Sequence, residues 1–323
     1  MQGQIFAISN RIPASAVELL REAGEVRQDP REKAIPRPDL LELVAGADAV
    51  LTLLHDRVDA ELLDAAGPQL RCVANLAVGY DNVDVAAAAE RGVVVTNTPE
   101  VLDDATADMT WALLLAATRR LVEGDRLVRS GQEWSWGMHF MLGSSLRGKR
   151  LGIVGLGGIG RRVAERGRAF GMEIAYHQRH PAPAEVEAAL AAERMPLQRL
   201  LAEADVLSLH CPLTPETHHL IGAEELESMK PSAVLVNAAR GPVVDERALA
   251  EALASGQIAA AGLDVYEHEP RVEPGLLELD NVVLAPHLGS ATVETRTAMA
   301  ELAARNAISV LRGQGPLTPV ASQ

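Results

Sequence analysis

The stretch LGIVGLGGIGRRVAERGRAFGMEIAYH, residues 151–177, decides the fold. It starts with a short apolar strand, passes through a glycine-rich turn, continues as a helical pattern and ends in a second apolar strand. A strand, a crossover helix and a second strand make a parallel β-α-β unit. We therefore predict a parallel sheet with helices packed on it in this part of the chain.

Glycine occupies three spaced positions of the turn. Gly155 permits the tight turn, Gly157 lets the backbone approach a phosphate, and Gly160 lets the helix pack close to the strand. The open N–H groups and the positive dipole end of the helix attract anions. Between a strand and a helix, this spacing predicts that a dinucleotide binds at the turn, with contacts from Gly158 and Ile159 as well.

The end of the second strand, His177, is followed by Gln178-Arg179-His180. A carboxylate here would bind the ribose 2′-hydroxyl and repel a 2′-phosphate, but no acid is present. Arg179 can instead form a bidentate pair with a 2′-phosphate, with Gln178 and His180 beside it. We predict a preference for NADP(H). In the alternative, Arg179 is a solvated loop residue and NAD(H) is used.

Short apolar strands and helical stretches alternate outward from this unit in both directions, which is typical of doubly wound α/β sheets. Four strands are predicted before it, at residues 4–9, 49–54, 72–77 and 93–97. Six strands are predicted from the unit onward, at residues 150–155, 173–177, 206–210, 233–237, 260–265 and 282–286. Six strands suffice for a complete dinucleotide-binding domain.

The main predicted helices cover residues 14–23, 59–66, 103–121 and 291–311, and Asp84 caps another that Gly92 ends. The helix over 103–121 is so rich in Ala and Leu that we place it at a domain or subunit interface. A loop with two tryptophans, QEWSWGMHFMLGSS (132–145), follows it.

Composition narrows the class of protein. A chain of 323 residues, 48% hydrophobic and 23% charged, is long enough for two globular domains. Its net charge of −14 argues against nucleic-acid and membrane partners. Cys72 and Cys211 lie in apolar strands and are interpreted as reduced thiols. The start, MQGQIFAISN, is a strand pattern rather than a signal peptide, and no apolar run spans a bilayer, so we expect a cytoplasmic protein. We predict no metal site.

Polar residues follow three of the later strands, where ligands bind in open α/β sheets. They are Arg240 in VNAARG (236–241), Glu267 and Glu269 in GLDVYEHEP (262–270), and His287 in LAPHLGSAT (284–292). Each has a plain structural alternative. The arginine could form a structural ion pair, the glutamates could be solvated, and the histidine could simply begin a helix.

Together these segments resemble a known family. With VGYDNVDVAAAAERGVVVTNTP (78–99), ATADMTWALLLAATRR (105–120) and HCPLTPETHHLI (210–221), they make essentially the whole chain similar to the D-isomer-specific 2-hydroxyacid dehydrogenases. Within that family the chain looks most like the glyoxylate/hydroxypyruvate reductases.

The resemblance implies that Arg240, Glu269 and His287 are the catalytic residues, because Glu269 and not Glu267 directly precedes the proline. It implies that Asp264 contacts the nicotinamide carboxamide. It further implies cofactor contacts from Cys211, Pro212, Thr217, Ala238 and Ala239, and from the catalytic residues Arg240 and His287.

The chemistry of a 2-keto acid suits these residue types. Arg240 would fix the substrate carboxylate with its planar fork of donors. His287 would give a proton to the keto oxygen as hydride reaches the keto carbon. Glu269 would favour the charged imidazolium and orient its ring. The expected product is the D-2-hydroxy acid.

The resemblance also implies a substrate pocket and an architecture. Val78 and Gly79 N–H groups would bind the substrate carboxylate opposite Arg240, Leu54 would line the pocket, and Trp136 would reach the partner's site in a homodimer. Residues 1–99 and 288–323 would form a flavodoxin-like substrate domain and residues 100–287 the Rossmann domain, with catalysis in the cleft between them. Two alternatives remain: an NAD-dependent dehydrogenase for another D-2-hydroxy acid, or a nucleotide-sensing, corepressor-like binding protein.

Overall fold

A computed structural model describes residues 3–320 of the chain. It contains two compact units: unit 1 comprises Met1–Leu102 and Ala291–Gln323, and unit 2 comprises Asp103–Ser290. The predicted domain boundaries, after residues 99 and 287, each lie three residues before these. Residues 1–2 of the predicted N-terminal strand pattern and residues 321–323 of the C-terminal tail lie outside the described residues. Among the described residues, no helix is long and apolar enough to cross a membrane.

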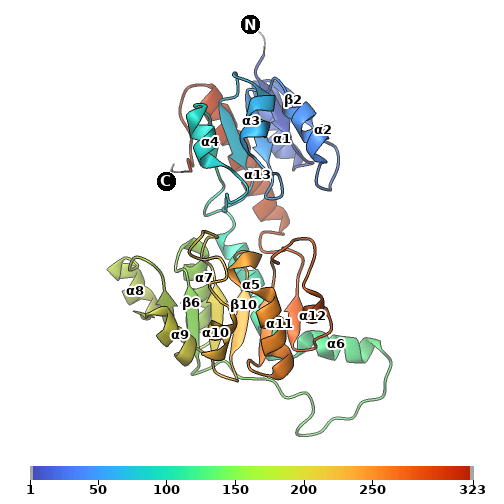
Figure 1. The fold of residues 1–323 in the computed structure, drawn as a ribbon, viewed down its shortest axis with the longest axis vertical. Coiled ribbons are helices and arrows are strands. Elements are labelled where there is room, and N and C mark those ends of the chain that lie inside the picture. Colours follow the sequence, from blue (N-terminus) through green and yellow to red (C-terminus); the bar gives the residue numbers. More distant parts are fainter. Residues whose placement is uncertain (1–2, 321–323) are drawn as a thin grey trace. The chain divides into compact units, whose positions relative to one another are not determined.

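Unit 1 is built on a five-stranded parallel sheet in the order β2-β1-β3-β4-β5 (Figure 1). This order is the flavodoxin-like form of the doubly wound fold. Helices α1 and α13 cover one face, where Phe6 and Leu51 meet Ala303, and α2, α3 and α4 cover the other. The strands are β1 Ile5–Ile8, β2 Glu25–Gln28, β3 Ala49–Thr52, β4 Cys72–Asn75 and β5 Val94–Thr96. The helices are α1 Ala14–Ala23, α2 Arg37–Val44, α3 Ala60–Ala66, α4 Val85–Glu90 and α13 Val293–Leu311.

Unit 2 is built on a seven-stranded parallel sheet in the order β12-β11-β10-β9-β6-β7-β8. Counted along the chain this is 7-6-5-4-1-2-3, the dinucleotide-binding order with one strand added. The strands are β6 Arg150–Val154, β7 Glu173–His177, β8 Ala192–Arg194, β9 Val206–Leu209, β10 Val234–Asn237, β11 Ala260–Leu263 and β12 Val282–Leu284. The helices are α5 Asp103–Thr118, α6 Leu121–Arg129, α7 Gly158–Ala169, α8 Ala184–Leu190, α9 Leu197–Glu203, α10 Ala223–Glu227, α11 Glu246–Ser255 and α12 Pro274–Leu277, with a 3₁₀ turn at Gly241–Val243.

The predicted fold class, two doubly wound parallel α/β sheets, is confirmed. Two strands escaped the sequence analysis, β2 (EVRQ) and β8 (AER). Both are short, polar strands at the edge of their sheets, where charged residues discourage pairing with other chains. They therefore lack the apolar pattern on which the prediction of strands depends.

The long helix predicted over residues 103–121 is wrong in its extent, because two helices cover this stretch. The α5 helix ends at Thr118, and Arg120 adopts a left-handed conformation (φ 52°) before α6 begins. The apolar residues of α5 are buried within unit 2, because Leu113 and Leu114 belong to the same core as Leu151 and Ile153 of β6. The apolar composition of α5 thus reflects a core helix and requires no subunit interface.

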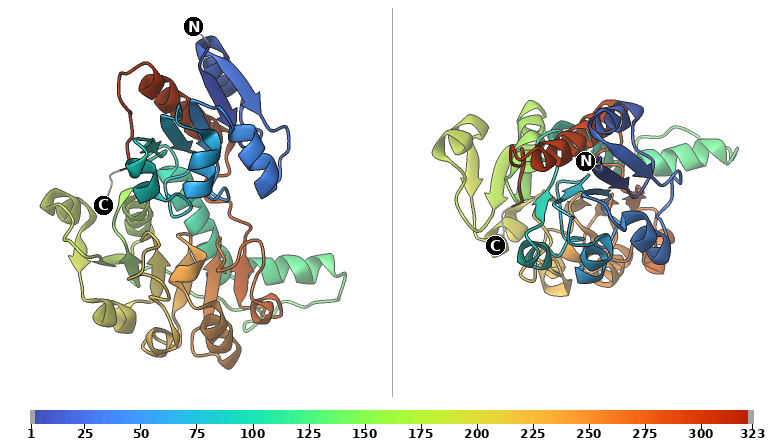
Figure 2. Two further views of the ribbon diagram at one scale, coloured as in Figure 1. Left: turned by 45° about the horizontal axis from the view of Figure 1, so that its top comes forward. Right: turned by 90° about the horizontal axis from the view of Figure 1, so that it is seen from above.

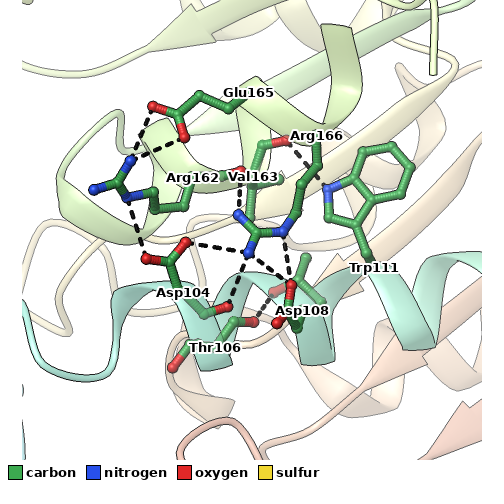
Figure 3. A network of polar contacts seen from close by, with 9 residues as sticks. Asp104, Thr106, Asp108, Trp111, Arg162, Val163, Glu165 and Arg166 are labelled. Carbon is green, nitrogen blue, oxygen red and sulfur yellow. Dashed lines mark hydrogen bonds and ion pairs between the residues drawn. The ribbon is translucent and has the colours of Figure 1, made fainter. Parts of the chain in front are cut away.

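Helix α7, which follows the glycine turn, is fixed against α5 (Figure 3). The buried Trp111 indole donates to the Val163 carbonyl oxygen (3.1 Å) and its ring stacks on Phe170, with centroids 4.5 Å apart. At the surface, the Arg166 guanidinium lies 2.6 Å from Asp108 and 3.2 Å from Asp104. Exposed ion pairs add little stability, so the indole contact and the apolar core hold α7 in place.

Candidate active site

The glycine turn has the backbone shape that a bound phosphate needs. Gly155 has φ 94°, and a Cβ there would lie 2.8 Å from the backbone of His210 and of Cys211. Gly157 is the N-cap of α7, and a Cβ there would meet nothing within 4 Å, so the space beside Gly157 is open, whereas a Cβ on Gly158 would meet the Asp103 carboxylate. The first turn of the helix, Gly158 to Gly160, has N–H groups without partners inside the helix. The turn therefore fits a pyrophosphate.

Side chains at the end of β7 support the turn. The Gln178 side-chain oxygen accepts the Leu156 N–H (2.9 Å), and Arg161 Nε donates to the Leu156 carbonyl oxygen (3.2 Å). Arg194, on β8, donates to the carbonyl oxygens of Gln178 (3.1 Å) and Arg179 (3.0 Å). The side chains of Arg179 and His180 are exposed beside them.

Sequence reasoning missed two of these residues. Arg161 follows the GGIG turn directly and could have been noticed as a cation at the phosphate-binding end of the helix. Arg194 lies on an edge strand that the sequence did not predict, so no signal placed it near Arg179.

The loop after β9 packs against the glycine turn. Burial raises the pKa of the Cys211 thiol to about 11, so it is a neutral thiol at pH 7. Thr217 Oγ1 donates to the Pro212 carbonyl oxygen (2.7 Å) and accepts the Thr214 N–H (2.8 Å), which closes the loop. Burial lowers the pKa of His210 to about 3, and among the described residues its Nδ1 has no hydrogen-bond partner. An orphaned buried nitrogen is the kind of group that a bound ligand satisfies.

The loop after β10 carries Arg240. Buried Asn237 shapes this loop: its side-chain nitrogen donates to the Arg240 carbonyl oxygen (2.9 Å), and its oxygen accepts the Ala239 N–H (3.1 Å). The half-buried Arg240 guanidinium donates to the Ala239 carbonyl oxygen (2.9 Å). Ala238 lies between them, at the end of the strand. Asn237 is a positioning residue that sequence reasoning did not identify.

Buried Asp264 organises the segment that carries His287. Its carboxylate accepts the N–H groups of Leu288 (2.6 Å) and Gly289 (2.7 Å), and its carbonyl oxygen accepts the His287 N–H (2.8 Å). Burial raises the pKa of Asp264, against the effect of these hydrogen bonds. His287 itself has φ 54°, a left-handed conformation that costs a non-glycine residue about 1–2 kcal/mol. Such local strain is found at functional sites.

The structure brings His287 and Glu269 together. His287 Nδ1 is 2.9 Å from Glu269 Oε2, and the other carboxylate oxygen accepts the Tyr266 N–H (3.1 Å). Burial would raise the pKa of Glu269, but the hydrogen bond and the charge of His287 outweigh it and lower that pKa. The charge of Arg240 acts in the same direction. Glu267 contacts a different group, His219 Nε2, at 2.8 Å.

The residues predicted to bind the substrate divide between the two units. In unit 1, Leu54 is exposed, and the carbonyl oxygens of Val78 and Gly79 accept hydrogen bonds from Asn97 (2.8 Å) and Asn75 (3.0 Å). In unit 2, Trp136 lies in the loop after α6, with 77% of its surface exposed.

These features define a class of enzyme. The sheet order of unit 2 and its glycine turn are those of a dinucleotide-binding domain. A histidine held by a carboxylate, with an arginine on the neighbouring strand-end loop, can exchange a proton beside a bound anion.

Comparisons with known proteins agree with this class. Residues 111–289 match the family described as "D-isomer specific 2-hydroxyacid dehydrogenase, NAD binding domain". The glyoxylate reductase of Thermococcus gammatolerans is 52% identical over 99% of this chain and 96% of its own. A glyoxylate reductase structure from Paecilomyes thermophila has TM-score 0.90 and 38% identity, over 99% of both chains.

A further solved structure contains ligands. It is the NADPH-dependent glyoxylate/hydroxypyruvate reductase of Sinorhizobium meliloti in complex with NADP and malonate, with TM-score 0.86 and 38% identity, over 99% of this chain and 97% of that one. The chain described here is an NAD(P)-dependent oxidoreductase. It belongs to the D-isomer-specific 2-hydroxyacid dehydrogenase family.

Proposed function

We propose that this chain reduces a small 2-keto acid, glyoxylate or hydroxypyruvate, to the D-2-hydroxy acid with NADPH. The observation that carries the proposal is the 2.9 Å contact between His287 Nδ1 and Glu269 Oε2. The names of the relatives described above support the choice of substrate. Because this site contains an acid-base pair, catalysis accounts for it better than the corepressor-like alternative does.

Each catalytic side chain has one task. Arg240 binds the substrate carboxylate, since its guanidinium presents two parallel donors to a planar anion. His287 holds its proton on Nε2, the nitrogen that does not face Glu269, and transfers it to the keto oxygen. Glu269 fixes the ring and stabilises the protonated imidazole before transfer. When bound, the nicotinamide cofactor supplies the hydride.

Unit 1 is proposed to be the substrate domain. Asn75 and Asn97 hold the carbonyl oxygens of the loop at Val78 and Gly79, which leaves the amide N–H groups of that loop for an anion. Leu54 would form an apolar wall of the pocket.

A substrate panel tests the reaction. Glyoxylate, hydroxypyruvate, pyruvate and a larger aliphatic 2-keto acid are compared by NADPH consumption, and the two small polar acids should have the highest kcat/KM. His287→Ala should lower kcat about 10²- to 10⁴-fold, the usual contribution of general acid catalysis. The matched control is His268→Ala, because His268 is exposed and directly precedes Glu269 in the chain. This variant should retain activity. Equal activity of His287→Ala and wild type would exclude the proposed proton donor.

The preference for NADPH is part of the proposal. Two arginines support it: Arg179 is exposed at the end of β7, and Arg194 hydrogen-bonds the carbonyl oxygens of the same loop. Both offer positive charge to a 2′-phosphate. We expect kcat/KM to be higher with NADPH than with NADH. Arg179→Ala should reduce this preference for NADPH, mainly by raising KM for NADPH. A wild-type enzyme that uses NADH equally well would contradict this part.

We also propose a homodimer formed through α6 and the arm, residues 130–145. Figure 2 shows this segment projecting from the rest of unit 2. Its large apolar side chains are exposed, namely Leu121, Val128, Trp134, Trp136, Met138 and Leu142. Exposed apolar side chains gathered on one projecting segment often mark a protein interface. Light scattering should give twice the chain mass of 34.4 kDa, whereas a monomer at micromolar concentration would refute the dimer.

A further inference from the structure

A second cluster of ligating side chains lies beside the candidate active site. His218 and His219 lie in the loop after β9, and Glu267 lies in the loop after β11. One nitrogen from each histidine and one carboxylate oxygen lie within 4.8 Å of one another. The sequence did not predict this cluster, because the histidines and the glutamate are nearly fifty residues apart.

Two of the three donors already face each other. His219 Nε2 is 2.8 Å from Glu267 Oε1. The His218 ring lies against the His219 ring, with centroids 4.1 Å apart and the ring planes tilted by 30°. The His218 side chain is exposed and can rotate, while His219 and Glu267 are half-buried.

The backbone around these donors is held from several sides. The His219 N–H donates to the Pro242 carbonyl oxygen (2.7 Å), and the His218 N–H donates to that of Thr214 (3.0 Å). The Glu267 N–H donates to the carboxylate of the buried Glu246. Donors on a fixed backbone lose little freedom when a metal binds, so such support strengthens a metal site.

We propose that His218, His219 and Glu267 bind one Zn²⁺ ion per chain. Two imidazoles and one carboxylate are a ligand set that zinc accepts, with water in the fourth position. Tetrahedral coordination needs donor atoms about 3.3 Å apart. The His219–Glu267 contact of 2.8 Å would therefore widen slightly, and the exposed His218, whose donor lies within 4.8 Å of the other two, would move closer. The net charge of −14 also favours the approach of a cation.

The site is separate from the proposed proton donor. Glu267 faces His219, while Glu269, two residues further, faces His287. Zinc at the cluster would hold Glu267 and thus the loop that also carries Glu269. The proposal does not depend on the substrate or on the reaction proposed above.

Calorimetric titration of chelator-treated protein with Zn²⁺ tests the proposal. Wild type should bind one equivalent. His218→Ala should weaken binding at least about tenfold, since even indirect supports of a metal site contribute 10- to 100-fold. His218 is exposed, so this variant should fold normally. His219→Ala and Glu267→Gln should weaken zinc binding further. The control is His139→Ala, which removes an exposed histidine of the arm and should bind zinc as wild type does.

Two further measurements separate a lost zinc ligand from a damaged fold. The melting temperature of each variant without zinc checks that the fold is intact, and the absorption spectrum of bound Co²⁺ should change when either histidine of the cluster is replaced. The proposal is overturned if wild type binds no Zn²⁺, or if binding survives His219→Ala and Glu267→Gln. It is likewise overturned if only His287→Ala abolishes binding, because the ion would then lie at the catalytic pair.

Discussion

The open space in front of Gly157 leads to a sharp prediction about Gly157→Ala. Gly157 has φ −77° and ψ −158°, which alanine can also adopt, and a Cβ there meets nothing within 4 Å. The free protein should therefore fold as wild type does. The new methyl group would occupy the space into which we expect the pyrophosphate to bind.

The size of the effect follows from the hydrogen bonds at the start of α7. A phosphate displaced by a methyl group would lose contact with about two N–H groups, each worth about 1.5–3 kcal/mol to a charged acceptor. The loss of about 3–6 kcal/mol corresponds to an increase in Kd of about 10²- to 10⁴-fold. The melting temperature without cofactor should not change.

Calorimetric titration with NADPH measures Kd, and differential scanning calorimetry measures the melting temperature. A Kd within about threefold of wild type, in a protein with an unchanged melting temperature, would mean that the pyrophosphate does not bind at Gly157. A lowered melting temperature would show instead that the methyl group disturbs the free turn.

Three other changes test neighbouring parts of the structure. Gly160→Ala places a Cβ onto the Gly155 carbonyl oxygen and 3.3 Å from Ile153. Calorimetry should therefore show a loss of about 1–3 kcal/mol in the free energy of unfolding. An unchanged melting temperature would contradict this packing. Glu246→Ala leaves the N–H groups of Glu267 and Glu273 without their acceptor, so kcat should fall while Kd for NADPH stays the same. Glu246→Gln should restore part of the activity. A fully active alanine variant would show that Glu246 does not support the loop that carries Glu267. The lowered pKa of Glu269 predicts that its stabilisation is complete above the unfolded-state value of about 4.3 and is lost as the pH falls through the lower folded-state value. The difference in melting temperature between wild type and Glu269→Gln should therefore disappear in acid, and a difference that is constant with pH would disprove the linkage.

The sequence predicted well the features that depend on a local pattern. Buried parallel strands such as β6 and β9 are continuous apolar runs, and the glycine turn is recognisable from its spacing alone. The end of α5 was missed because nothing in an alanine- and leucine-rich run indicates that Arg120 will turn left-handed. The edge strand β8 was missed because solvent, rather than a core, selects its residues.

Sequence reasoning proposed the residues of the candidate site whose type indicates a chemical role. It missed the residues that only hold the backbone of the site in place. Arg240 and His287 are conspicuous at strand ends, and the identity of the glutamate came from a family resemblance. Asn237 and Glu246 gave no such signal. Their role is to satisfy backbone N–H and C=O groups of loops whose paths are set by the tertiary structure.

Unit 1 is built from both ends of the chain, and this affects how the protein folds during its synthesis. The α13 helix covers, together with α1, one face of a sheet whose strands all lie in the first hundred residues. At a synthesis rate of 5–20 residues per second, the roughly 190 residues between the two parts take about 10–40 s to emerge. During that time Phe6, Leu51 and Cys72 lack the helix that buries them in the finished protein. Unit 2, which is continuous in sequence, has its last strand synthesised before unit 1 can be completed, so the nascent chain needs protection at its first domain rather than its second.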